Sequence, residues 1–369
     1  MLKMVRDRWS ACRASRSLII MALALLSMAS TRVGALTVEE IAVLKGPDRD
    51  KTLLDGARAE GKVVLYSGMI VNQALRPLAA AFKAKYPFVN LEYWREDSST
   101  ILQKIIAERR SNAQLVDVVE WGGGVPLIIQ ADMVVPFTSP SLNHYPKAYY
   151  DAEGRYAATR LGYYGTAFNT RLVSDAEVPK SYEDLFLPKW RGKISWPISE
   201  QGSLQFIIHT MMHMGDQKGE AYLQKLAQQN LVSFTGSARA LVDQVGQGEI
   251  PLAIQIYAHH PLISKAKGAR LDVQMMAPIP SDISAVQLVK GAKHPHAAML
   301  FIDFILSKEG QTVLQQAEYL PADPEVEPQE SLRKIVPRLA GMAENVISPL
   351  AFFDRRDMAV GIYEKYFRK

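Results

Sequence analysis

Short apolar strands alternate with amphipathic helices along the first third of the chain. Strands are expected at 62–66, 89–93 and 116–119, and segments of about 10 to 15 residues with apolar side chains at helical spacing follow them. This alternation predicts an α/β fold built from βαβ units, with mixed but mainly parallel sheets flanked by helices. Binding loops in such sheets lie at the carboxyl ends of the strands.

A second block of the same kind begins near residue 156. After it, the strand expected at 284–289 and the helix expected at 295–306 return to the style of the first block, and no flexible linker separates the blocks. Two lobes joined by continuous strands can move about a hinge. We therefore expect a signal peptide at 1–35, lobe one at 36–155, lobe two at 156–278, a return to lobe one at 279–325 and a C-terminal helical segment at 326–369.

The N-terminal 35 residues have the layout of a secretory signal peptide. A basic stretch ends at Arg16, an apolar run covers 18–29, and small residues allow cleavage after Ala29 or Ala35. The apolar run is too short to span a bilayer. Cys12, the single cysteine, precedes the run, so a lipid anchor is not expected. A buried N-terminal helix is the alternative, but export to the periplasm fits the basic flank better.

Charge and motifs narrow the function. The net charge of +5 falls within residues 1–35, so the remaining chain is balanced and carries no basic footprint for nucleic acid. Without cysteine after Cys12, disulfides, thiolate catalysis and cysteine metal sites are excluded there. No P-loop, nucleophile elbow or dinucleotide fingerprint occurs. We expect no enzyme activity and no cofactor.

The segment Tyr182–Ile194, with the sequence YEDLFLPKWRGKI, resembles one typical of bacterial family 1 extracellular solute-binding proteins. That group includes ferric iron, thiamine, polyamine and phosphonate binders of ABC importers. Further matching segments follow in the expected order at 62–68, 165–170, 248–253 and 307–311. The resemblance implies a two-lobed periplasmic binding protein fold of type 2, a small-molecule ligand in the cleft and a membrane permease as partner. We expect a monomer that carries an anionic or zwitterionic solute.

Ferric-iron members of the family use a histidine after the first strand, a glutamate near the third strand and paired tyrosines in lobe two. In this sequence those positions fall near Met69, Gly122 and His259, with Tyr257 close by. Because a hard cation needs an oxygen-rich shell, direct binding of bare iron is not expected. A ferric iron or iron-chelate binding protein on the same fold is the first alternative. A secreted enzyme and a sensor-type receptor on the same fold are the others.

Candidate ligand contacts lie at helix starts and strand ends. Free backbone N–H groups and hydroxyls at helix starts suit anions, although plain N-capping explains each one singly. The candidates at helix starts are Ser67, Gly68, Ser98, Ser99, Gly202, Ser203 and Ser237. The candidates at strand ends or bends, which could hold the ligand body or instead pack in the core, are Trp121, Gly122, Tyr163, Trp196, Tyr257 and His259.

Arginine and histidine leave further alternatives open. Arg95 and Arg160 could hold an anion in bidentate fashion, although a structural ion pair is the commoner role. His209 and His213 have the i, i+4 spacing of a metal chelate, but no glutamate follows His209 and apolar residues lie between them. We therefore expect a structural role for this pair and no metal site.

Overall fold

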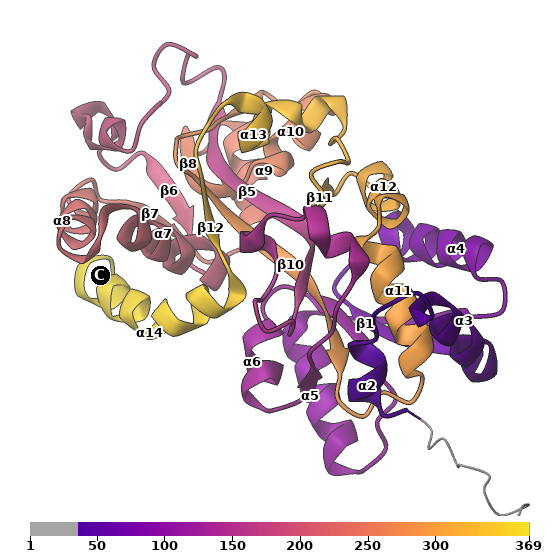
Figure 1. Ribbon diagram of the computed structural model, residues 1–369. Coiled ribbons are helices and arrows are strands. Elements are labelled where there is room, and N and C mark those ends of the chain that lie inside the picture. The colour runs from indigo at the N-terminus through magenta and orange to yellow at the C-terminus, as the bar shows by residue number, and fades with distance from the viewer. Residues whose placement is uncertain (1–35, 369) are drawn as a thin grey trace, which may run out of the picture. The chain divides into compact units, whose positions relative to one another are not determined.

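The computed structural model describes residues 36–368, and the expected signal peptide lies outside that range (Figure 1). The chain divides into a short unit, Met1–Thr37, and a large unit, Val38–Lys369, whose fold is described here. Its strands form one continuous path in the order β2-β1-β3-β10-β5-β8-β6-β7. No helix of the described residues is both long and apolar enough to cross a membrane.

Lobe one is built on parallel strands β1 (Lys62–Ser67), β2 (Asn90–Arg95) and β3 (Val118–Trp121). Helices α3 (Arg49–Glu60), α4 (Arg76–Lys85) and α11 (Pro295–Leu306) gather on one side, and α5 (Ser98–Arg110) and α6 (Val125–Gln130) lie apart from them (Figure 1). Phe82 of α4 packs edge-on against Phe301 and Phe304 of α11, with ring centroids 5.4 Å apart in both pairs. These aromatic contacts join segments far apart in the sequence into one core.

Lobe two has β6 (Ile194–Pro197) between β7 (Val232–Phe234) and β8 (Leu252–Tyr257), all parallel. Strand β9 (Leu271–Gln274) pairs with β5 at its edge. Its helices are α7 (Gln205–Met214), α8 (Asp216–Ala227), α9 (Ala238–Gln247) and α10 (His259–Ala266).

Two long antiparallel strands pass between the lobes. Strand β5 (Ala157–Asn169) pairs with β10 (Ile279–Val289) through its first half and with β8 and β9 through its second half. Strand β10 in turn pairs with β3 and β4 (Val134–Val135) of lobe one. The sheets are thus parallel within the lobes and antiparallel where the chain crosses. This is the two-lobed arrangement, with lobes joined by continuous strands, that the absence of a flexible linker in the sequence predicts.

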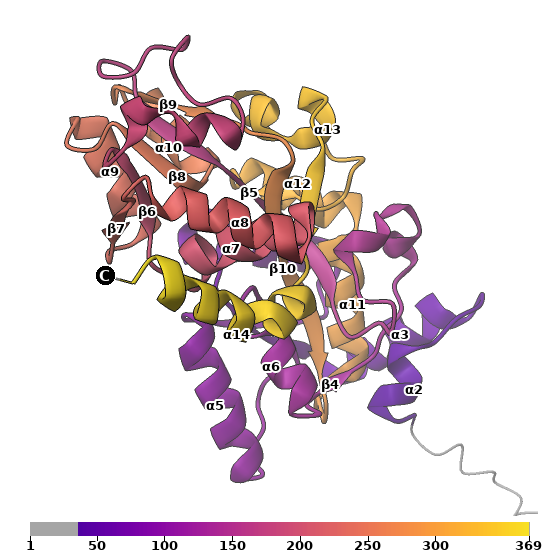
Figure 2. The same ribbon diagram turned by 90° about the vertical axis from the view of Figure 1, so that its left-hand side faces the viewer.

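The C-terminal part returns to both lobes. After α12 (Lys308–Gln316), β11 (Leu320–Pro321) pairs with β5, and α13 (Pro337–Ala340) precedes β12 (Glu344–Ile347), which runs parallel to β10. Helix α14 (Pro349–Tyr366) then packs on α6 of lobe one and on α7 and α8 of lobe two (Figure 2). The tail is therefore not wholly helical, because β12 adds a strand beside the crossing region.

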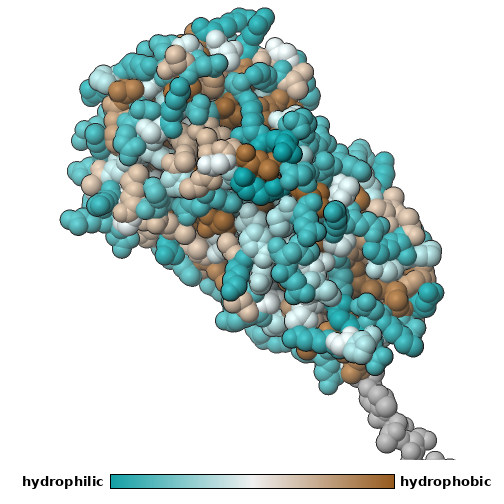
Figure 3. All heavy atoms as spheres, turned by 45° about the horizontal axis from the view of Figure 1, so that its top comes forward, coloured by the Kyte–Doolittle hydropathy of each residue, from teal (hydrophilic) through white to brown (hydrophobic). Residues whose placement is uncertain are grey.

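Residues 36–60 contain two helices, α2 (Val38–Ala42) and α3. Gly46, with φ of +88°, and Pro47 fall between them and break the helix. On the face seen in Figure 3, hydrophilic residues prevail and apolar residues form separate patches. The remaining short helices are η1 (Val71–Leu75), η2 (Pro140–His144), η3 (Lys147–Tyr149), η4 (Glu183–Phe186), η5 (Pro188–Trp190), η6 (Glu200–Leu204) and η7 (Glu330–Ile335).

Candidate functional site

A cavity of about 160 Å³ lies beside the crossing strand β10, where both lobes and the C-terminal segment meet. The loop after β3, helix α7, the end of β8 and helix α14 each contribute to its wall. The lining residues are Gly122, Gly123, Pro126, Leu127, Gln205, Tyr257, Asp282, Ile283, Ser284, Ile347, Pro349, Phe352, Phe353 and Arg356.

One wall is a buried cluster of oxygen atoms around Asp282. The hydroxyls of Tyr164 and Tyr257 both donate to Asp282 Oδ2, at 2.7 and 2.8 Å, and the two rings stack with centroids 4.5 Å apart. A side chain at Gly162 would place its Cβ 2.2 Å from Asp282 Oδ1, so only glycine leaves room for the cluster. Burial raises the pKa of Asp282, against the two hydroxyl donors, and raises those of both tyrosines well above 10.

Gln205 gives this wall a hydrogen-bond donor that lacks a well-formed hydrogen bond. Its Oε1 accepts from the Tyr164 hydroxyl at 3.1 Å, whereas its buried Nε2 makes only a weak contact with the Asp282 carboxylate and no regular hydrogen bond among the described residues. A buried amide group left in this state costs about 1–3 kcal/mol. The amide of Gln205 lines the cavity and is therefore suited to an oxygen atom of a bound solute.

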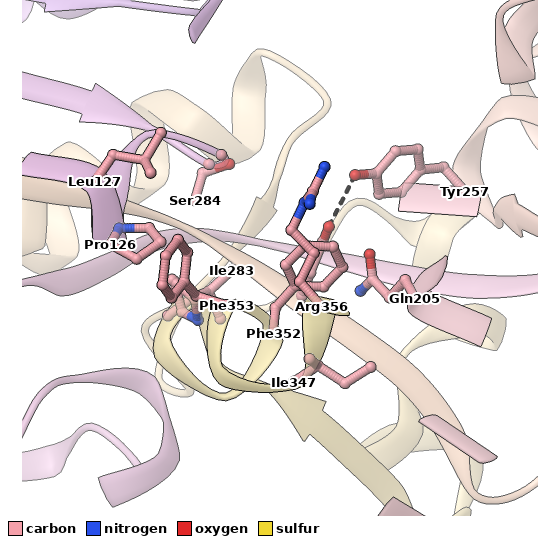
Figure 4. A pocket seen from close by; sticks show the side chains of 14 residues that line it. Pro126, Leu127, Gln205, Tyr257, Ile283, Ser284, Ile347, Phe352, Phe353 and Arg356 are labelled. Carbon is pink, nitrogen blue, oxygen red and sulfur yellow. Dashed lines mark hydrogen bonds between the residues drawn. The ribbon is translucent and has the colours of Figure 1, made fainter. Parts of the chain in front are cut away.

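The opposite wall comes from helix α14. Phe352 and Phe353 form an apolar surface with Pro126 and Leu127, and the guanidinium of Arg356 extends from the helix toward Tyr257 (Figure 4). The Arg356 side chain also lies 3.7 Å from Asp357, which is fully exposed. The cavity thus combines a positive charge and neutral donors with an aromatic surface.

A second buried group of polar side chains, centred on Glu120, lies near the N-terminal end of the crossing strand β5. Glu120 at the end of β3 is fully buried and accepts from Ser67 Oγ at 2.7 Å, Thr159 Oγ1 at 2.8 Å and Arg160 Nε at 3.1 Å. Burial disfavours the charge on Arg160, but the Glu120 carboxylate outweighs this effect and raises the pKa of the guanidinium above its ordinary value. Arg160 also lies 4.9 Å from the Tyr319 ring centroid, and it serves as a structural ion pair between the strands.

Of the thirteen expected ligand contacts, Gly122 and Tyr257 line the cavity. Ser67 is fully buried and holds Glu120, while the Gly68 amide donates to the Glu120 carbonyl. The others that the structure buries in the lobes are Trp121, Tyr163, Trp196 and Ser203. Trp121 donates its indole N–H to Gln287, and Trp196 packs against Phe367 of the C-terminal segment, with ring centroids 4.7 Å apart.

At two of the helix starts where an anion was expected, side chains of the protein already accept hydrogen bonds from the free backbone amides. Asp97 caps α5, and its carboxylate accepts from the amides of Ser99 and Thr100 and from both hydroxyls. These donors lower the pKa of Asp97. The carboxylate places a negative charge beside Ser98 and Ser99, which disfavours an anion there. Ser237 accepts from the Ala240 amide and is an ordinary N-cap.

Gly202 and the histidines have structural surroundings. A Cβ at Gly202 would lie 2.2 Å from the Pro197 carbonyl, so the glycine permits close backbone packing. His259 begins α10, 5.7 Å from the Tyr257 ring, and burial lowers its pKa to about 3. His209 is buried and its Nδ1 lies 2.8 Å from Asn345 Nδ2.

The cavity residues that the sequence interpretation missed come mainly from β10 and α14. Asp282 and Ser284 lie on a strand that looks like ordinary core from its apolar pattern, and Arg356 lies in a tail with no motif. The sequence feature that could have indicated a ligand-binding wall in this tail is the pair Phe352-Phe353 followed by two arginines up to Arg356.

A pocket between two α/β lobes, set on the strands that cross between them, defines a ligand-binding protein. Residues 125–338 match the family of bacterial extracellular solute-binding proteins, and the chain belongs to that family. It is 23% identical over 226 residues to an Fe(3+)-binding periplasmic protein of Serratia marcescens, covering 59% of this chain and 66% of that protein. It is 24% identical over 250 residues to a putative 2-aminoethylphosphonate-binding periplasmic protein of Salmonella typhimurium, covering 64% of this chain and 70% of that protein.

A solved structure shares the fold. The periplasmic binding protein AfuA of Actinobacillus pleuropneumoniae, with fructose-6-phosphate bound, matches with a TM-score of 0.65 and 22% identity over 84% of this chain and 99% of that one. Family and fold are those of solute-binding proteins, as the segment at 182–194 predicts.

Proposed function

We propose that the protein is the periplasmic binding component of an ABC importer and captures a small organic anion with an apolar or zwitterionic body. The observation that carries this proposal is the buried Nε2 of Gln205, a donor without a regular hydrogen bond, in the same cavity as Arg356. An anionic oxygen would satisfy the amide and pair with the guanidinium. Phe352 and Phe353 would cover the body of the solute.

The route from binding to transport follows from the placement of the cavity. The solute binds most tightly when it contacts both lobes at once, which requires the lobes to be close together. Binding therefore shifts the population of the protein toward the closed form. A membrane permease would then recognise that form. No step requires chemistry on the solute, and we propose no catalysis, no nucleic-acid partner and a monomeric state.

The ranges proposed for the parts are a leader at 1–35, lobe one at 36–155 and 279–325, and lobe two at 156–278. Packing of α14 on α7 and α8 supports assigning the segment 326–369 mainly to lobe two. Export to the periplasm, with cleavage after Ala29 or Ala35, is part of the same proposal.

A thermal-shift panel tests the solute class. The probes are 2-aminoethylphosphonate, with the cation ethanolamine as its control, and fructose 6-phosphate, with uncharged fructose as its control. Citrate is added as a carboxylate probe. A ligand at 100 times its Kd stabilises the folded state by about 2.7 kcal/mol, a shift of a few degrees. We expect at least one anion to raise the melting temperature and its counterpart to leave it unchanged. If none of the three anions does so, the proposed solute class is wrong.

A ferric complex is the second candidate, and the cluster of Tyr164, Tyr257 and Asp282 favours it. Three oxygen atoms in contact are a donor set that suits a hard cation. Burial opposes it, because the pKa values of both tyrosines are raised and phenolate is therefore disfavoured. Ferric citrate added to the protein would give a visible absorption band if a tyrosinate bound the iron, and Tyr257→Phe would weaken that band. A spectrum that is only the sum of those of the protein and of ferric citrate argues for the organic anion.

A further inference from the structure

A cluster of one imidazole and two carboxylates lies outside the cavity. His144 ends the short helix η2, and Asp323 and Glu325 follow β11, so segments far apart in the sequence meet there. One ligand atom of each side chain lies within 4.8 Å of the others. His144 and Glu325 are exposed and Asp323 is fully buried.

The buried carboxylate of Asp323 points one oxygen into this cluster without a hydrogen-bond donor. Its Oδ1 accepts from the Glu325 amide at 2.8 Å, whereas its Oδ2 has no hydrogen bond among the described residues. The ring Nε2 of His144 lies 3.1 Å from Oδ2. Two ligands at about 2.1 Å from one tetrahedral ion lie about 3.4 Å apart, so a small adjustment of the exposed His144 ring would let both bind one ion.

The surroundings hold the backbone that carries Asp323 in place. The amides of Ala322 and Asp323 both donate to Gln311 Oε1, at 2.8 and 3.2 Å. Gln311 is itself buried, and its Nε2 donates to the carbonyls of Thr159 and Ile305. Such fixed outer contacts orient the ligands of metal sites. Asp323 is thus oriented before any ion arrives.

We propose that His144, Asp323 and Glu325 bind a divalent transition metal ion, with zinc as the best fit. One imidazole nitrogen and two carboxylate oxygens form a mixed donor set that suits zinc, whereas magnesium and calcium prefer oxygen alone. Water completes the coordination, since His144 and Glu325 are exposed.

The position gives the ion a mechanical role. Strand β11 pairs with the crossing strand β5 through Leu320 and Leu161. Zinc would fix the segment after β11 to helix η2 of lobe one and thereby anchor the edge of the crossing strand. This site is independent of the solute in the cavity, so the two proposals stand or fall separately.

Calorimetry with zinc chloride tests the site on the untagged mature chain after removal of metal with a chelator. We expect saturation at one ion per chain. Glu325→Gln and His144→Ala change exposed side chains, and each is expected to weaken zinc binding by about tenfold or more. Asp323→Asn keeps the shape of the side chain and should weaken binding as well. Calcium chloride should give no comparable binding.

His213→Ala is the matched control, because it removes an exposed imidazole on another helix. Three outcomes would overturn the proposal. Zinc binding does not saturate in the unmodified chain, or it is unchanged in both Glu325→Gln and His144→Ala, or it is lost in His213→Ala. Crystals soaked in zinc give a second readout. The proposal requires an anomalous peak between His144, Asp323 and Glu325, and a peak only elsewhere would reject it even if Asp323→Asn fails to fold.

Discussion

The hydroxyl of Tyr257 donates to Asp282 Oδ2 at 2.8 Å and thereby joins the end of β8 in lobe two to the crossing strand β10. Tyr257 and Asp282 both line the cavity. A solute that touches this pair therefore contacts the strand along which the lobes are connected.

Replacing Tyr257 by phenylalanine removes that hydrogen bond and leaves Asp282 with one tyrosine donor. A hydrogen bond to a charged group contributes about 1.5–3 kcal/mol, so the free energy of unfolding should fall by about that amount. Urea unfolding measures the change. Tyr363→Phe is the control, because its hydroxyl bonds to no other described residue; equal losses in the two variants would contradict the assignment.

Arg356→Gln should weaken binding of the organic anion found by the thermal-shift panel. Loss of a charged contact worth about 1.5–3 kcal/mol raises Kd by about 10- to 150-fold. Calorimetric titration checks this. Arg355 is the adjacent control, since it is exposed and does not line the cavity. Arg355→Gln should bind as the unmodified protein does, and similar losses in both would point to a general charge effect.

Gly162→Ala should destabilise the protein. The added Cβ would lie 2.2 Å from Asp282 Oδ1 and 2.6 Å from Tyr257 Cε1, and overpacking of this kind costs about 1–3 kcal/mol. Gly361 in α14 has open space around it, so Gly361→Ala should instead add about 0.5–1 kcal/mol. Urea unfolding of the pair tests both signs, and a neutral Gly162→Ala would show that the cluster can relax.

His209 should make the fold sensitive to acid. Burial lowers its pKa from 6.5 to about 3, so between those values the unfolded chain binds a proton that the folded chain does not. Stability is therefore complete above about pH 6.5 and falls as pH drops, by about 2 kcal/mol at about pH 5 from this residue. In His209→Gln, the loss between about pH 7.5 and about pH 5 should shrink by that amount. His213→Gln, which alters an exposed ring, should keep the full loss.

The sequence pattern predicted the elements well because periodicity reflects burial. The strands expected at 62–66, 89–93 and 116–119 lie close to β1, β2 and β3, and the strand expected at 284–289 lies within β10. Gly46 and Pro47 are likewise a local signal for the break between α2 and α3. Family resemblance at 182–194 predicted the fold class that the comparisons support.

Side-chain direction at the site could not be predicted in the same way. Trp121 ends a strand that is buried along its whole length, so its place at the carboxyl end does not expose the ring. Asp97 directly before Ser98 and Ser99 was a readable N-cap, and its carboxylate takes up the donors expected for an anion. Arg356 reaches the cavity only through packing of α14 on both lobes, which no local pattern encodes.

Helix α14, the last long element of the chain, supplies Phe352, Phe353 and Arg356 to the cavity wall. One wall of the cavity therefore exists only when α14 is packed against both lobes. Deleting α14 from Pro349 onward should abolish capture of the solute even when the two lobes fold.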